Sequence, residues 1–194
     1  MATHMDAQRG EAPAVVTGSD IVVRSGARRW LAAARISTGF IFLWAFLDKT
    51  FGLHYSTGAA TSDGSPASLS WLEGGTPSQG FMKFASVGPF KDFFADIASP
   101  ATDWLFMLGL LGIGVAVMLG VGLRLAAVAG SLMMLLMWVA EWPLLQGSTN
   151  PVMDYHVIYA LVLIISAVTL AGDTWGLGRR WAALPLVQRN AWLR

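Results

Sequence analysis

Five ionisable residues stand at the ends of apolar segments, where they could exchange protons or hold a charged ligand. Asp48 and Lys49 end the first apolar segment, Glu141 ends the third, and Asp154 and His156 open the fourth. Carboxylates that crowd together at a partly dry site hold protons more tightly, so such a group can take up and release protons near neutral pH. Lys49 adds a cation that could stabilise an anionic substrate. These residue types predict a proton-exchanging site, and the alternative is a ring of interfacial charges that anchors the helix ends.

Aromatic residues accompany these ionisable groups. Tyr155 and Tyr159 are spaced one helical turn apart in the fourth apolar segment, and Trp44 and Trp142 belong to the ends of the first and third. Rings beside proton-exchanging groups suit the headgroup of a quinone, whose reduction takes two electrons and two protons. The alternative is the ordinary belt of Trp and Tyr at the membrane–water interface.

The composition excludes several other chemistries. The chain has no Cys, which rules out disulfides, thiolate-held iron–sulfur clusters and covalent c-type haem. Its three histidines, His4, His54 and His156, are too few for a convincing all-protein metal site, so neither haem nor metal is predicted. The net charge of +1 gives no electrostatic case for nucleic acid.

The elements that must position these residues are membrane helices. Hydrophobic residues make up 55% of the 194 residues and charged residues 13%, against roughly 25% charged in soluble domains. Mean hydropathy is +0.55. Four segments, about 30–51, 104–123, 125–142 and 153–171, are apolar enough to cross a hydrocarbon core of roughly 30 Å. Because backbone polar groups in lipid must bond internally, we expect an all-α integral membrane protein built as a four-helix transmembrane bundle.

The predicted spans divide the chain into a membrane domain and two tails. Residues 1–29 are polar and rich in small residues, which predicts a disordered tail, residues 30–172 form the membrane domain, and residues 173–194 form a second tail. The connection over residues 52–103 is long and carries aromatic residues at near-helical spacing, interrupted by Gly88-Pro89. We expect one or two short amphipathic helices there, which lie on the outer interface and either shield a site or act only as an anchor.

The arginines indicate the orientation in the membrane. All ten lie in the two tails, at the start of the first span or in the link between the second and third, whereas the three lysines lie on the other side. Positively charged residues favour the cytoplasmic side. The sequence therefore predicts a multi-pass protein of a prokaryotic cytoplasmic (inner) membrane, with both termini cytoplasmic and residues 52–103 extracytoplasmic.

Two further features predict how the helices are held together. Arg35 lies inside the first span, and we expect it either to extend to the inner headgroups or to pair with Asp173 beyond the fourth span. Gly112, Ala116 and Gly120 repeat at four-residue spacing, which favours close packing of the second span against the third.

Several motifs resemble those of the DoxX-like membrane proteins. The first span carries RISTGFIFLWAFLDK, the long connection carries WLEGGTPSQGF and GPFKDFF, and the fourth span opens with Asp154-Tyr155-His156 and is followed by AGDTWGLGRRW. The similarity is closer to the DoxD group, the large membrane subunits of thiosulfate:quinone oxidoreductase. This resemblance implies a four-helix membrane bundle and, in some members, electron transfer to a quinone.

Two functions remain open from the sequence. The chain is either a membrane subunit of a quinone-linked oxidoreductase, with thiosulfate or another reduced sulfur compound as donor, or a non-catalytic accessory or assembly subunit of a larger respiratory complex. In the first case the expected catalytic residues are Asp48, Lys49, Glu141, Asp154 and His156, and the expected quinone contacts are Trp44, Trp142, Tyr155 and Tyr159. The expected partners are the lipid bilayer, quinone, and either another subunit or a second copy of the chain.

Overall fold

The computed structural model describes residues 16–58, 68–145 and 150–194, and the regular elements in these ranges are helical. Three helices are long and apolar enough to cross a membrane: α2 (Ser25–Phe51), α4 (Pro100–Leu119) and α5 (Leu123–Glu141). A fourth apolar helix, α6 (Tyr155–Val168), has 14 residues. The predicted all-helical fold is therefore confirmed in the described ranges, with three of the four predicted spans long and apolar enough to cross a membrane.

Short helices fill the connections and the ends of the chain. They are α1 (Gly18–Ile21), η1 (Trp71–Glu73), η2 (Phe81–Ala85), α3 (Lys91–Ile97), η3 (Ala171–Asp173), α7 (Gly178–Ala182), α8 (Pro185–Arg189) and η4 (Ala191–Leu193). α2 begins at Ser25, before the predicted boundary, and α1 precedes it within the segment predicted to be a tail. Arg28 connects the two, because its Nη1 donates to the carbonyls of Val22 (2.8 Å) and Val23 (2.7 Å). Residues 1–15 of the predicted tail lie outside the described ranges.

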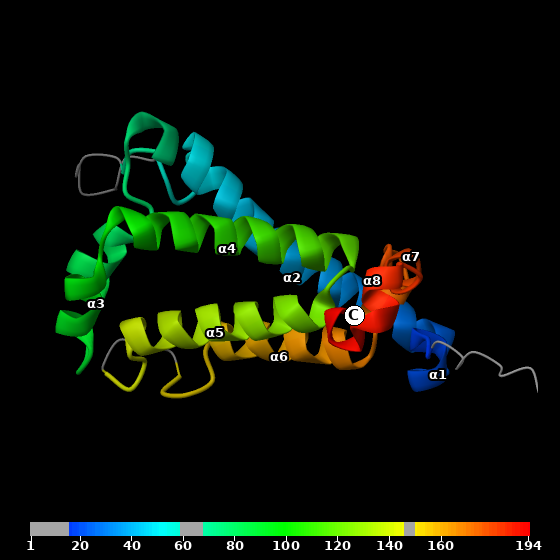
Figure 1. Ribbon diagram of the computed structural model, residues 1–194. Helices are drawn as coiled ribbons and strands as arrows, with labels where there is room; N and C mark the ends of the chain where they lie inside the picture. The colour runs from blue at the N-terminus through cyan, green and yellow to red at the C-terminus, as the bar shows by residue number, and fades with distance from the viewer. Residues whose placement is uncertain (1–15, 59–67, 146–149) are drawn as a thin grey trace, which may run out of the picture.

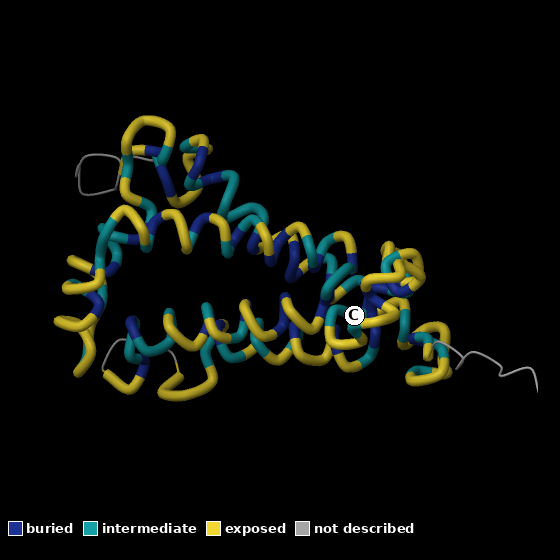
Figure 2. The backbone as a smooth tube through the Cα atoms, in the orientation of Figure 1, coloured by how far each residue is buried: buried dark blue, intermediate teal, exposed yellow. Residues whose placement is uncertain are grey.

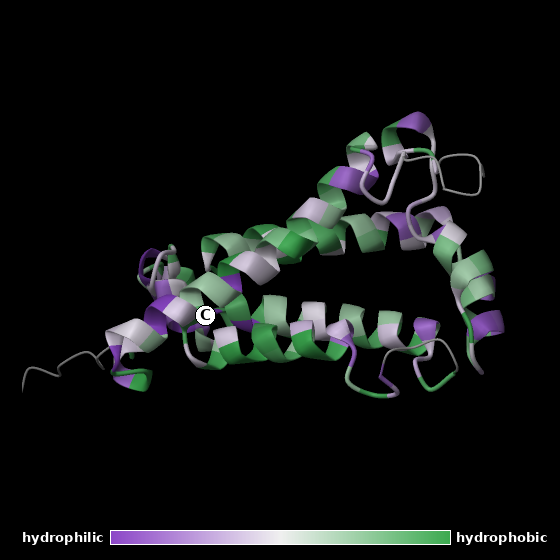
Figure 3. Ribbon diagram, turned by 180° about the vertical axis from the view of Figure 1, so that it is seen from behind, coloured by the Kyte–Doolittle hydropathy of each residue, from purple (hydrophilic) through white to green (hydrophobic). Residues whose placement is uncertain are grey.

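The four apolar helices lie as two pairs, α2 along α4 and α5 along α6 (Figure 1). Buried and exposed positions alternate along α4 and α5 (Figure 2), so each helix presents one face to the protein and another to its surroundings. Hydrophobic residues dominate the middle of the helices and hydrophilic residues gather toward their ends (Figure 3). Large apolar side chains on the outer faces, such as Leu105 (73% exposed) and Val128 (70%), are those that a lipid bilayer would cover.

Two glycines allow the close packing of α2 on α4. A Cβ atom added to Gly114 of α4 would lie 2.7 Å from the backbone nitrogen of Leu43 in α2, and one added to Gly39 would lie 2.8 Å from that of Met118. By contrast, a Cβ atom on Gly112 would meet no atom within 4 Å. The prediction that Gly112 packs the second span against the third is therefore wrong, since the face that carries Gly114 packs on α2 instead.

A strap, defined here as residues 78–99, joins the two pairs at one end of the molecule (Figure 1). At the start of α4, the buried carboxylate of Asp103 accepts the N–H and the hydroxyl of Ser78 (both 2.7 Å) and the side-chain amide of Gln79 (2.6 Å). At the end of α5, the N–H of Val87 donates to the carbonyl of Ala140 (2.8 Å). We call this end of the molecule the strap end, and the opposite end, where residues 16–22 and 191–194 lie, the termini end.

Arg35 holds the termini end together from inside α2. Its side chain is fully buried, and Nη1 donates to the carbonyls of Val117 and Met118 (2.7 Å to Met118), which belong to the last turn of α4. Nη2 donates to the carbonyls of Trp175 (3.0 Å) and Thr174 (3.3 Å). The carbonyl of Val117 also accepts the N–H of Gly120 (3.2 Å), but a carbonyl in the last turn of a helix, such as that of Met118, lacks a helical partner. The guanidinium therefore satisfies a group that lipid could not.

Asp173, the expected partner of Arg35, is bound to other groups. Its Oδ2 accepts the N–H of Gly18 (2.8 Å) and an N–H of the Arg194 side chain (3.0 Å). Both predictions for Arg35, pairing with Asp173 and extension to the headgroups, are therefore wrong, because backbone carbonyls from two segments surround the guanidinium.

Candidate functional site

Three of the five predicted catalytic residues come together at the strap end. One possible ligand atom from each of Glu141, Asp154 and His156 lies within 4.8 Å of the others. Glu141 is the last residue of α5, and Asp154 is the N-cap of α6, so the ends of two packed helices position the group. We call these three residues the acidic–histidine cluster.

Asp154 fixes the position of His156. Oδ1 of Asp154 accepts the backbone N–H groups of His156 (3.0 Å) and Val157 (3.3 Å), which are donors that the first turn of a helix leaves unpaired. Oδ2 of Asp154 lies 2.8 Å from Nδ1 of the His156 ring. The imidazole is 0% exposed, and its Nε2 has no hydrogen-bond partner among the described residues. The ring is thus held through Nδ1, while Nε2 is buried without a partner in the described part of the chain.

Tyr155 connects His156 with Glu141. Its hydroxyl donates to Oε1 of Glu141 (3.0 Å), and its ring centroid lies 4.0 Å from that of His156 and 5.8 Å from that of Tyr159. Tyr155 is 49% exposed beside the fully buried imidazole, so a ligand from outside would meet the phenol ring first.

Trp142 continues the aromatic surface toward the strap. Its ring centroid lies 6.0 Å from that of Trp138 and 5.8 Å from that of Phe90 in the strap. Trp138 is itself held by a hydrogen bond from Nε1 to the carbonyl of Val152 (3.1 Å). Three of the four predicted quinone contacts, Trp142, Tyr155 and Tyr159, therefore lie on the α5–α6 pair.

Asp48, Lys49 and Trp44 lie on the other helix pair. The buried carboxylate of Asp48 accepts the N–H of Tyr55 (3.2 Å) and both the N–H and the hydroxyl of Ser56 (2.9 and 2.7 Å), so it folds the segment after α2. Trp44 packs on Tyr55 as well, with ring centroids 5.1 Å apart.

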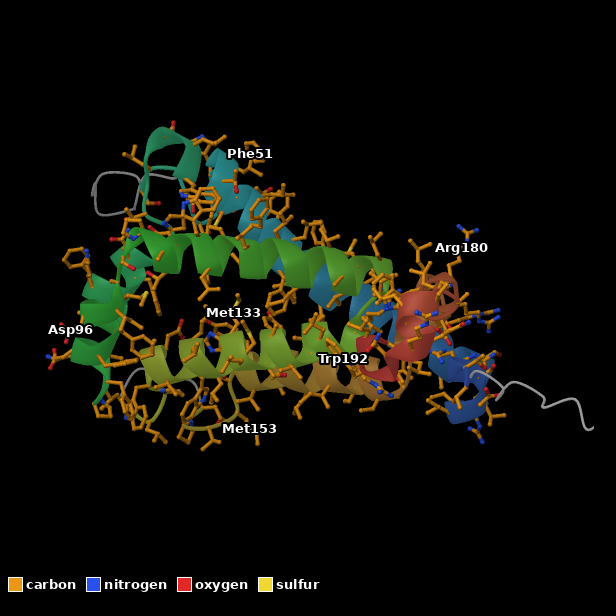
Figure 4. The ribbon with its side chains drawn as sticks, viewed as in Figure 1. Phe51, Asp96, Met133, Met153, Arg180 and Trp192 are labelled. Carbon is orange, nitrogen blue, oxygen red and sulfur yellow. The ribbon has the colours of Figure 1, made fainter. Side chains whose placement is uncertain are left out.

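The helix directions explain this separation. The C-terminal part of α2 leans away from the α5–α6 pair (Figure 1). Phe51, at the end of α2, and Met153, just before α6, accordingly lie at opposite edges of the molecule (Figure 4). Within the described ranges, neither Asp48 nor Lys49 forms a hydrogen bond or an ion pair with the acidic–histidine cluster.

Another carboxylate on the α2 side is held in a similar way. Oε2 of Glu73 accepts the hydroxyl (2.7 Å) and the N–H (3.0 Å) of Ser70, and these hydrogen bonds hold the pKa of Glu73 below its usual value. This group caps η1 and is structural.

The contact between the strap and the acidic–histidine cluster was not predicted from the sequence. Asp103 anchors one end of the strap, and Val87 joins the other end to the carbonyl of Ala140, the residue before Glu141. The sequence did indicate that Asp103 needs partners, because it is a carboxylate in the first turn of an apolar helix. It did not indicate which residues these partners are, since Ser78 and Gln79 lie more than 20 residues away in the chain.

Two carboxylates, an imidazole and a phenol make this cluster able to hydrogen-bond a polar ligand or to ligate a cation. Comparisons of the chain with protein-family models, with curated proteins and with solved structures give no match, so the interpretation of this site rests on its own geometry.

Proposed function

We propose that the chain is a membrane subunit of a quinone-linked oxidoreductase that binds the quinone headgroup beside His156. One observation carries this proposal: a fully buried imidazole is fixed through Nδ1 by Asp154, while Nε2 has no partner in the described part of the chain. With Nδ1–H donating to Asp154, Nε2 can accept a hydrogen bond from a hydroxyl of the quinol form. The ring of the same molecule could stack on Tyr155 and Tyr159, which already form a ring pair. Asp48, Lys49 and Trp44 have no part in this site.

The electrons must come from outside the chain. With no Cys, the chain carries no thiol that could relay them. The resemblance to the DoxX-like proteins names thiosulfate, or another reduced sulfur compound, as the donor. When thiosulfate is the donor, two thiosulfate ions join through a new S–S bond to form tetrathionate and release two electrons, which a partner subunit could deliver. With two protons from water, these electrons convert a quinone to a quinol.

The proposal includes a topology. α6 forms the fourth span, both termini are cytoplasmic, and the strap lies on the extracytoplasmic surface of a prokaryotic cytoplasmic membrane. The support is the arginine distribution, with all ten on the side of the termini, together with the exposed apolar residues of the strap, Phe84 (87%), Phe93 (54%) and Phe90 (46%). Such residues suit a helix that lies in the interface.

Cysteine labelling tests the topology without background, because the chain has no Cys. Ser68 and Ser25 are both exposed, and they lie on opposite sides in the proposed arrangement. A membrane-impermeant maleimide added to intact cells should modify Ser68→Cys and leave Ser25→Cys unmodified. Both should react after the membrane is opened. The reverse pattern in intact cells would overturn the orientation.

Quinone turnover tests the function. With thiosulfate and a short-chain quinone, His156→Ala should lower the turnover of the purified protein, assayed with any co-purifying subunit, by about 100-fold, since loss of one positioned hydrogen-bonding group costs a factor of this order. Asp154→Asn should lower it as well, because the amide keeps the helix cap but not the carboxylate that holds Nδ1. Asp96→Asn, an exposed change in α3, is the matched control and should retain parental turnover.

The possible outcomes test the location of the site and the quinone-reducing function separately. If the parent is active and both cluster variants keep full activity, the site is wrong. If the parent neither binds nor reduces quinone even with its co-purified subunits, the chain is an accessory subunit.

A further inference from the structure

The acidic–histidine cluster places two carboxylates together beside one imidazole. Glu141 and Asp154 place two carboxylates within 4.8 Å of each other and of the His156 ring. Among the described residues, no Lys or Arg forms an ion pair with either carboxylate. Two carboxylates this close, at the end of an apolar helix pair, destabilise each other unless a cation or a proton lies between them.

The imidazole of His156 supplies a neutral ligand in the same place. It is 0% exposed, and Nδ1 faces the cluster, where it forms a 2.8 Å hydrogen bond with Oδ2 of Asp154 that a metal ion between the two atoms would replace. Nε2 has no partner in the described ranges, so the hydrogen bonding of this buried ring is incomplete. A fully buried histidine that meets two carboxylates is a different feature from a patch of surface acids.

We propose that Glu141, Asp154 and His156 bind one divalent transition-metal ion, with Zn²⁺ as the best-suited ion and Nδ1 as the histidine ligand. Two carboxylates and an imidazole match the ligands that Zn²⁺ takes in proteins, and three protein ligands leave one position open for water or a substrate. The imidazole selects against Mg²⁺, which prefers oxygen ligands alone.

The surrounding hydrogen bonds would orient these ligands. Asp154 can ligate through Oδ2 while Oδ1 continues to cap α6, and Glu141 accepts Tyr155 at Oε1, which leaves Oε2 for the ion. Partners that hold ligands in this way contribute to metal affinity. All three ligands also come from the ends of two packed helices.

A metal on Nδ1 would place the imidazole proton on Nε2. His156 could then donate a hydrogen bond to a quinone oxygen, which accepts hydrogen bonds and has none to give. This last consequence rests on the proposed function; the metal site itself does not.

Calorimetric titration with ZnCl₂ tests the metal site in the absence of quinone. The full chain, purified in detergent and treated with a chelator, should bind one Zn²⁺ per chain, and excess Mg²⁺ should not compete. Glu141→Gln and His156→Ala should weaken binding at least ~100-fold, since even partners of metal ligands are worth 10- to 100-fold. Asp96→Asn removes an exposed carboxylate of the strap and should bind as the parent does.

Co²⁺ supplies a second measurement that does not depend on stoichiometry. When bound by the parent it should give an intense visible absorption typical of four-coordinate nitrogen and oxygen ligation, and this band should be lost in Glu141→Gln. Thermal melting of each variant shows whether it is folded. The proposal is overturned if the parent binds no stoichiometric Zn²⁺, or if Glu141→Gln and His156→Ala bind it as tightly as the parent. Neither result bears on quinone turnover, so the two proposals fail separately.

Discussion

Arg35→Gln should lower the unfolding free energy of the detergent-solubilised protein by about 3 kcal/mol or more, because it removes a fully buried group with several charged hydrogen bonds. The guanidinium donates to carbonyls of Val117 and Met118 and to those of Thr174 and Trp175, so one side chain connects α2, the end of α4 and the segment after η3. Its loss removes these charged hydrogen bonds, and at the end of α4 lipid offers no donor to replace them. Chemical or thermal unfolding followed by tryptophan fluorescence measures the effect.

Two matched variants make this result specific. Arg180 is exposed, as Figure 4 shows at the termini end, and Arg180→Gln should unfold as the parent does. Arg35→Lys keeps the charge but cannot reach carbonyls on both sides, so its stability should lie between those of the parent and Arg35→Gln. Parental stability of Arg35→Gln would show that the carbonyls of α4 find other partners.

Gly114→Ala and Gly39→Ala should each lower the unfolding free energy by about 1–3 kcal/mol, the usual cost of overpacking a close contact. At both positions the added methyl group would lie under 3 Å from backbone of the facing helix, which cannot move away as a side-chain tip can. The same substitution at Gly112 meets no atom within 4 Å, and in a helix Ala is better than Gly by roughly 1 kcal/mol. Gly112→Ala should therefore keep or raise the stability.

The three alanine variants can be compared in one experiment that measures the melting temperature of each in detergent. Since they differ only in position, a common loss at all three would point to a general effect of the methyl group. Full tolerance at Gly39 and Gly114 would show that α2 and α4 are further apart than described.

Hydropathy was sufficient to predict the three long helices, because the length and apolar character of a span are local properties of the chain. The pairing of the helices was not predictable in this way. α4 carries Gly109, Gly112 and Gly114 on several faces and ends at the C-cap Gly120, and a four-residue spacing alone does not tell which face meets a neighbour. The spacing favoured Gly112, whereas the close contact forms at Gly114, opposite Leu43.

The proximity of Glu141, Asp154 and His156 was predictable because it depends on the chain order of two adjacent helices. Glu141 and Asp154 end and begin consecutive helices, so antiparallel packing brings them together. Asp48 and Lys49 belong to a helix that leans away, and its tilt depends on packing against α4, which the sequence does not encode locally. The partners of Arg35 were predicted wrongly for a related reason. A buried charge suggests an opposite charge as its partner, but backbone carbonyl groups can also accept its hydrogen bonds, and no residue type in the sequence indicates them.

The hydrogen bond from Val87 to the carbonyl of Ala140 gives the strap a thermodynamic role. Ala140 directly precedes Glu141, and Phe90 packs on the ring of Trp142, so the strap contacts the residues on both sides of this carboxylate. Any ligand that needs Glu141 in its present position therefore binds more tightly when the strap is docked. By thermodynamic linkage, binding of the same ligand must stabilise the docked strap by the free energy that docking of the strap adds to ligand binding. Protection of the Val87 amide from hydrogen exchange would then report on occupancy of the cluster without a probe in the cluster itself.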